Sequence, residues 1–135
     1  MGLESELSTK VYRLMELHQE FADGNYEEMN ALYADDFQGS LYMPRVGQVE
    51  NFNADQIKEG NKEAANHFNG KKMQFIFSGL QIVPQHENQA AVSYEITYRD
   101  EERMVRALNL EVWRKGTDEK WRIIRWYQEK GQSET

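Results

Sequence analysis

Four long β-type segments joined by short polar turns fill the C-terminal half of the chain, and they constrain its fold more than any other feature. They span residues 73–83, 90–98, 103–115 and 120–128. In the second segment apolar residues occupy every other position, at Val92, Tyr94, Ile96 and Tyr98, which is the pattern of a half-buried strand. Short turns can join only antiparallel neighbours, so these segments predict an antiparallel sheet.

Helical periodicity replaces this pattern in the N-terminal half. Apolar residues recur every three or four positions over residues 3–21, and a shorter stripe over residues 26–33 follows Gly24. Residues 37–43 predict a strand and residues 44–52 a loop. Asn53 and Gln56 form the capping pattern that begins a third helix over residues 53–68. Helices segregated from an antiparallel sheet define an α+β fold. We expect a single domain over residues 1–135, frayed at residues 1–9 and 131–135.

The composition excludes several classes of protein. The chain has 16 Lys and Arg against 23 Asp and Glu, a net charge of −7, which disfavours nucleic acid as a partner. It has no Cys, so it lacks a thiolate nucleophile and Cys-ligated metal sites. No apolar run approaches the roughly 20 residues of a membrane helix, and no signal peptide is visible. We therefore expect a cytoplasmic protein without a membrane partner.

Several short motifs resemble the NTF2-like superfamily, which includes SnoaL-like and ketosteroid isomerase-like proteins. The motifs LMELH (14–18), ADGNYE (22–27) and ALYADDF (31–37) resemble its opening, and EVWRK (111–115) with EKWRII (119–124) resembles its last hairpin. The resemblance implies a cone-shaped barrel with a ligand pocket, in which three N-terminal helices pack on a strongly curved, mostly antiparallel sheet. It also implies a homodimer formed through the sheet.

The same resemblance suggests which residues act in the pocket. The position of a Tyr that hydrogen-bonds the developing oxyanion in ketosteroid isomerases falls on His18, and that of a protonated Asp falls on Glu111. The family's general base falls on Leu41 or Met43, according to the alignment, and neither residue can accept a proton. Whether the chain is an enzyme therefore stays open at this point.

The residues themselves give His18 and Glu111 two interpretations each. His18 lies on the apolar stripe of the first helix, where an imidazole could move a proton or could simply be a core residue. Glu111 alternates with Asn109 and Trp113, on the strand face opposite to Leu108 and Leu110. On an inner face, Glu111 would have a raised pKa and could act as an acid or base. On an outer face it would lie in solvent or in a dimer interface.

Aromatic walls with a few polar anchors suit an apolar or ring-containing ligand. We expect the residues that line such a pocket to be Asn109, Tyr42, Phe68, Tyr94 and Trp113. We expect no metal site and no cofactor. The sequence thus predicts a protein that binds a small molecule, and the catalytic form of this prediction is a cofactor-free isomerase, dehydratase or hydrolase that uses His18 and Glu111. The alternative is a noncatalytic dimerisation or interaction module with a vestigial pocket.

Overall fold

A computed structural model describes residues 2–44 and 46–134. The helical elements are α1 (Leu3–Gln19), the 3-10 turn η1 (Glu20–Asp23), α2 (Glu27–Asn30) and α3 (Ala54–Phe68). The strands are β1 (Tyr33–Met43), β2 (Gln48–Asn53), β3 (Gln74–His86), β4 (Gln89–Arg99), β5 (Met104–Lys115) and β6 (Trp121–Glu134). No helix within the described ranges is long and apolar enough to cross a membrane.

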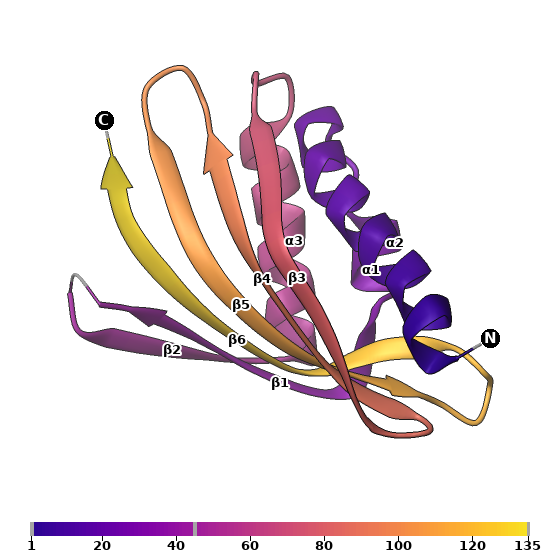
Figure 1. Cartoon of the computed structure of the whole chain (residues 1–135). Coiled ribbons are helices and arrows are strands. Elements are labelled where there is room, and N and C mark those ends of the chain that lie inside the picture. Colours follow the sequence, from indigo (N-terminus) through magenta and orange to yellow (C-terminus); the bar gives the residue numbers. More distant parts are fainter. Residues whose placement is uncertain (1, 45, 135) are drawn as a thin grey trace.

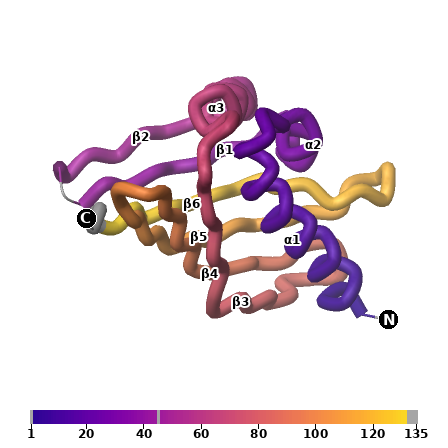
Figure 2. The backbone as a smooth tube through the Cα atoms, turned by 90° about the horizontal axis from the view of Figure 1, so that it is seen from above, coloured from indigo at the N-terminus to yellow at the C-terminus, as the bar shows by residue number. Residues whose placement is uncertain are grey.

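The six strands form one bent sheet in the order β2-β1-β6-β5-β4-β3. All neighbours are antiparallel except β1 and β6, which are parallel. The helices lie on one side of this sheet, and the sheet curves around them (Figures 1 and 2). The predicted α+β class, with helices on a curved, mostly antiparallel sheet, is confirmed. The sheet itself is not closed, because β2 and β3 remain its two edges.

The helices contribute one face each to the core. In α1 the buried residues are Leu7, Val11, Leu14 and Leu17, at the helical spacing that the sequence shows. At the start of α3 the Asn53 side chain accepts from the Gln56 backbone N–H, and the Gln56 side chain accepts from the Asn53 N–H, each over 2.9 Å. This reciprocal cap fixes the start of α3 where the motif predicts it.

Two segments near the first strand differ from the sequence prediction. Residues 48–52, expected to be a loop, form most of β2, which pairs antiparallel with β1. An edge strand whose side chains are mostly exposed on both faces shows no alternation of apolar and polar residues, so its sequence does not reveal it. Tyr33, expected to end the second helical stripe, begins β1 and pairs with Ile123 of β6. The second helix is therefore shorter than predicted and spans only Glu27–Asn30.

Regular secondary structure also reaches closer to both chain ends than expected. Residues 3–9 form the first turns of α1. Residues 131–134 continue β6, because β5 supplies backbone partners at Val105 for Ser133 and at Met104 for Glu134. Of the predicted frayed ends, residues 1 and 135 lie outside the described residues. The segment expected over residues 73–83 likewise continues past Pro84 to His86, since β3 is an edge strand and tolerates the missing N–H.

Candidate functional site

The face of β5 that carries Glu111 is the inner one. Asn109 and Glu111 are each only 2% exposed, whereas Leu108 is 49% and Leu110 46% exposed. The remaining inner residues of β5 are also buried, namely Val105, Ala107 and Trp113. The two leucines therefore face away from the helices, and the polar residues lie between the sheet and the helices.

Glu111 is held by two neighbours on this inner face. The Tyr94 hydroxyl donates a hydrogen bond to Glu111 Oε2 over 2.8 Å, and Trp113 Nε1–H donates to Oε1 over 3.0 Å. Burial disfavours the charged carboxylate and raises the pKa of Glu111 from 4.5 to about 7. The two hydrogen bonds favour the carboxylate and oppose that rise. Glu111 is therefore a fixed carboxyl group that is poised to lose or gain a proton near neutral pH.

A chain of hydrogen bonds leads to this carboxyl group along three strands. Gln128 Nε2 donates to Asn109 Oδ1 over 2.7 Å, across the paired positions of β6 and β5. Asn109 also hydrogen-bonds the Tyr94 hydroxyl and partly offsets the rise of its pKa. Burial and the charge of Glu111 nevertheless raise the pKa of Tyr94 well above its ordinary value, so its phenol keeps its proton. The network therefore runs from Gln128 to Glu111 with donors aimed at the carboxyl group.

Tyr33 also belongs to the surroundings of Glu111, although sequence reasoning missed it. Its side chain is buried at the start of β1. Its pKa is raised, first by burial and then by the charge of Glu111. The only sequence signal was its place in an apolar stripe, which was interpreted as helical. Gln128 was missed for a different reason, since an amide near the end of a strand is not distinctive before its partner is known.

His18 lies on the inner side of α1 in an aromatic environment. Its ring centroid is 5.8 Å from that of Phe21, 5.8 Å from that of Phe75 and 5.5 Å from that of Phe77. Nδ1 lies 3.0 Å from the Leu14 carbonyl oxygen. Because a carbonyl can only accept, Nδ1 carries the proton in the neutral ring and Nε2 has the lone pair. Burial lowers the pKa of His18 from 6.5 to about 4, so the ring is neutral at neutral pH.

The two predicted catalytic residues are separated by two aromatic rings. Phe77 lies between them on the His18 side, with its ring centroid 5.6 Å from that of Tyr94, which in turn bonds Glu111. The pKa of each of the two residues is shifted by its own surroundings and not by the other residue. His18 and Glu111 therefore occupy one interior but do not form an acid–base pair.

The other predicted site residues divide between the two faces of the sheet. Phe68, at the end of α3, packs against Phe75 of β3 with ring centroids 6.4 Å apart. Tyr42 lies on the outer face, because it pairs with Glu129, which pairs with the exposed Leu108. Leu41, at one of the two positions of the family's general base, pairs with Gln128 and shares the inner face with it.

A small cavity of about 160 Å³ adjoins this inner face where β4 ends and β5 begins. Tyr98 of β4 and Val105 of β5 form one wall, and Phe68 with Met73 forms another. Glu111 is not among the residues that line it. Lys130 Nζ lies 5.8 Å from the centroid of the Tyr98 ring and places one cation near this end. Within the described ranges, no group of three or more His, Asp or Glu side chains could hold a metal ion.

Comparison with solved structures identifies the fold. An NTF-2-like protein of unknown function from Pseudomonas aeruginosa superposes with a TM-score of 0.73 at 13% identity, over 93% of this chain and 98% of its own. A scytalone dehydratase-like protein from Novosphingobium aromaticivorans gives 0.69 at 16% identity, over 96% and 88%. A protein from Xanthomonas campestris that resembles the calcium/calmodulin-dependent protein kinase II association domain gives 0.66 at 22% identity, over 96% and 88%.

These similarities define the chain as a protein of NTF2-like fold, so the predicted resemblance to that superfamily is confirmed at the level of the fold. No protein-family model and no curated protein sequence matches the chain.

Proposed function

We propose that this protein binds a small, largely apolar molecule on the inner face of its sheet, with Glu111 as the group that hydrogen-bonds it. The observation that carries this proposal is the buried Glu111 carboxyl, which Tyr94 and Trp113 fix from two sides. A buried ionisable group with a raised pKa costs stability, and such groups cluster at functional sites. Apolar side chains surround this carboxyl, and this suits a ligand with one or two polar atoms.

The catalytic form of the proposal rests on the same carboxyl group. Glu111 is the only buried Asp or Glu among the described residues, and neither Leu41 nor Met43, the two candidates for the family's base position, can accept a proton. A single carboxyl group with a pKa of about 7 can both take and return a proton at neutral pH. We therefore propose a cofactor-free isomerisation, dehydration or hydrolysis as the reaction class, in which His18 contributes its Nε2 lone pair. The scytalone dehydratase-like neighbour supports this class of chemistry by fold analogy alone.

A thermal denaturation screen tests the binding proposal. We expect some ring-containing ketones, alcohols or carboxylic acids to raise the melting temperature, since a ligand at 100 times its Kd stabilises the native state by about 2.7 kcal/mol. Glu111→Gln should weaken that binding about tenfold, the usual effect of losing one charged hydrogen-bond partner. Glu95→Gln is the matched control, because Glu95 lies on the exposed outer side of β4 and pairs with Arg106. The proposal fails if no compound stabilises the protein or if Glu111→Gln binds as tightly as the wild type.

The outer face of the sheet supports a second candidate function, a dimerisation module. Leu108, Leu110 and Tyr127 are 49%, 46% and 39% exposed there, and Leu110 pairs directly with Tyr127. Exposed apolar side chains that adjoin on a sheet face are typical of interaction surfaces. The neighbour that resembles a kinase association domain favours this candidate by analogy. A homodimer through the sheet is compatible with a ligand on the inner face.

Light scattering at micromolar concentration tests the dimer. We expect a particle of about twice the 15.9 kDa chain mass. Leu110→Arg should raise the dimer dissociation constant about 30-fold, since it buries an unpaired charge at the centre of the surface. Tyr12→Arg is the control, because Tyr12 is also an exposed apolar residue but lies on α1. A wild-type protein that stays monomeric under these conditions would contradict the dimer.

A further inference from the structure

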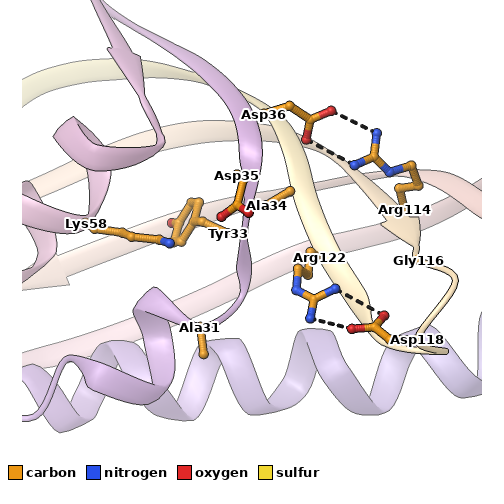
Figure 3. Close-up of a pocket in the computed structure, with 10 residues that line it drawn as sticks. All are labelled: Ala31, Tyr33, Ala34, Asp35, Asp36, Lys58, Arg114, Gly116, Asp118 and Arg122. Carbon is orange, nitrogen blue, oxygen red and sulfur yellow. Dashed lines mark hydrogen bonds and ion pairs between the residues drawn. The ribbon is translucent and has the colours of Figure 1, made fainter.

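A second cleft, of about 560 Å³, has neither Glu111 nor the residues of the small cavity in its lining (Figure 3). Three segments distant in sequence meet there: the start of β1 with Ala31 just before it, Lys58 of α3, and the β5–β6 turn with its flanking residues. Its lining includes three acidic and three basic side chains, so the cleft has no net charge. Tyr33, Ala34 and Ala31 add apolar surface.

Four of the six charged side chains neutralise one another. Arg114 donates through Nη1 and Nη2 to the two oxygens of Asp36, over 3.1 and 3.0 Å. Arg122 donates in the same way to Asp118, over 3.2 and 2.7 Å. Figure 3 shows both pairs on one side of the cleft, with Lys58 reaching in from the other. Such two-point pairs hold both partners in a fixed geometry.

One cation and one anion remain, Lys58 and Asp35. Neither forms an ion pair with any other residue in the described part of the chain. The charge of Asp35 acts over a longer range on Arg122 and contributes to the raised pKa of that guanidinium. An ammonium and a carboxylate that share a cleft without pairing directly leave space for a molecule that carries one negative and one positive group.

A distortion of β1 places Asp35 in this cleft. Successive residues of a regular strand point to opposite faces, so Asp35 and Asp36 would be separated by the sheet. The register between β1 and β6 is broken between Tyr33 and Gln38, which face Ile123 and Arg125. The irregularity leaves both Asp side chains exposed and lining one cleft. Bulges of this kind often redirect side chains beside a binding site.

The opposite wall also depends on a specific residue. A Cβ atom at Gly116 would lie 2.9 Å from Asp118 Oδ1 and 3.5 Å from Arg122 Nη1. A side chain at that position would therefore press on the Asp118–Arg122 pair. Glycine lets the β5–β6 turn approach this pair and complete the wall.

We infer that this cleft binds a small zwitterion with the chemistry of a free α-amino acid. The carboxylate of the ligand pairs with Lys58 and its ammonium group pairs with Asp35, while a short apolar side chain contacts Tyr33 and Ala34. A cleft without net charge favours such a ligand over a simple anion or cation, because both of its unpaired charges are then satisfied. The inference does not rest on the ligand proposed for the inner face, although Tyr33 borders both sites.

Isothermal titration calorimetry of the full chain with glycine, alanine and valine tests the inference. We expect saturable binding of at least one of them, with the amide form and the N-acetyl form of the same amino acid at least about tenfold weaker. The amide keeps only the positive charge and the N-acetyl form only the negative one. Equal binding of the N-acetyl form would show a simple anion site and overturn the inference, as would the absence of binding by all three amino acids.

Two variants with matched controls locate the binding. Asp35→Asn and Lys58→Met should each weaken binding about tenfold or more. Both side chains lie near the surface, and the hydrogen bond at Lys58 uses its backbone oxygen, so both variants should fold. Lys62→Met and Asp55→Asn change exposed charges of α3 outside the cleft and should leave binding unchanged. Unaltered binding in both Asp35→Asn and Lys58→Met would overturn the assignment.

Discussion

Glu111→Gln is expected to make the free energy of unfolding rise by about 3 kcal/mol between pH 4.5 and 7, whereas the wild type stays nearly flat. In the wild type, the buried Glu111 and the partly buried His18 act in opposite directions over this range. Glu111 has a folded pKa raised from 4.5 to about 7, and His18 has one lowered from 6.5 to about 4. Each shift corresponds to about 3 kcal/mol.

The signs follow from which state binds the proton more tightly. Folded Glu111 keeps its proton at a pH where the unfolded chain has lost it, so its contribution to stability is present below pH 4.5 and is lost as the pH rises through 7. Between pH 6.5 and 4, His18 is protonated in the unfolded chain but stays neutral in the folded protein. Its contribution to stability is therefore present above pH 6.5 and is lost as the pH falls through 4. When Glu111 is removed, only the rise of stability with pH that His18 causes remains.

Urea unfolding at several pH values measures this effect. The Gln side chain can keep its oxygen toward Trp113 and its amino group toward the Tyr94 hydroxyl oxygen, so the variant should fold. Glu95→Gln makes the same chemical change on the outer face and should leave the shape of the profile unchanged. A Glu111→Gln profile as flat as that of the wild type would show that this carboxyl does not titrate in the folded interior.

His18→Phe is expected to give the opposite profile, with stability falling by about 3 kcal/mol between pH 4.5 and 7. Phenylalanine keeps an aromatic ring among Phe21, Phe75 and Phe77, but its side chain does not titrate. Only the loss of the Glu111 contribution then remains as the pH rises. The same urea titration measures it, and His67→Phe, on the exposed surface of α3, is the control.

The double variant His18→Phe/Glu111→Gln completes the test. It should return to a flat profile over this range, because both opposing groups are gone. Carboxyls whose pKa is lowered, such as Asp36 and Asp118, lose their contributions at lower pH and affect all variants alike. A slope in the double variant comparable to that of either single variant would mean that some other buried group dominates.

These opposing titrations bear on the proposed function. At neutral pH His18 is neutral and Glu111 is close to its pKa, so the interior holds one imidazole lone pair and one exchangeable carboxyl proton. Phe77 and Tyr94 separate the two groups, so they would act on different atoms of a ligand instead of passing a proton directly. This arrangement can serve a chain that has Leu41 or Met43, according to the alignment, at the position of the family's general base.

Much of the fold could be predicted from periodicity. The apolar stripe of α1, the cap at Asn53 and the alternation in β4 each depend on interactions a few residues apart, so the sequence shows them directly. The strand β2 could not be predicted, because its exposed side chains obey no pattern. The continuation of β6 past residue 130 depends on hydrogen bonds from β5, which are visible only once the two strands are paired.

The sequence by itself determined that Asn109, Glu111 and Trp113 share one face of a strand, because the period of two residues is a property of the backbone. It could not determine which face points inward, since Leu108 and Leu110 make the opposite face an equally plausible core. Only the tertiary structure decided this, because α1 and α3 pack on one side and withdraw Glu111 from water. Tertiary structure likewise joined Lys58, Asp35 and the β5–β6 turn in one cleft, since residues so far apart in sequence meet only through folding.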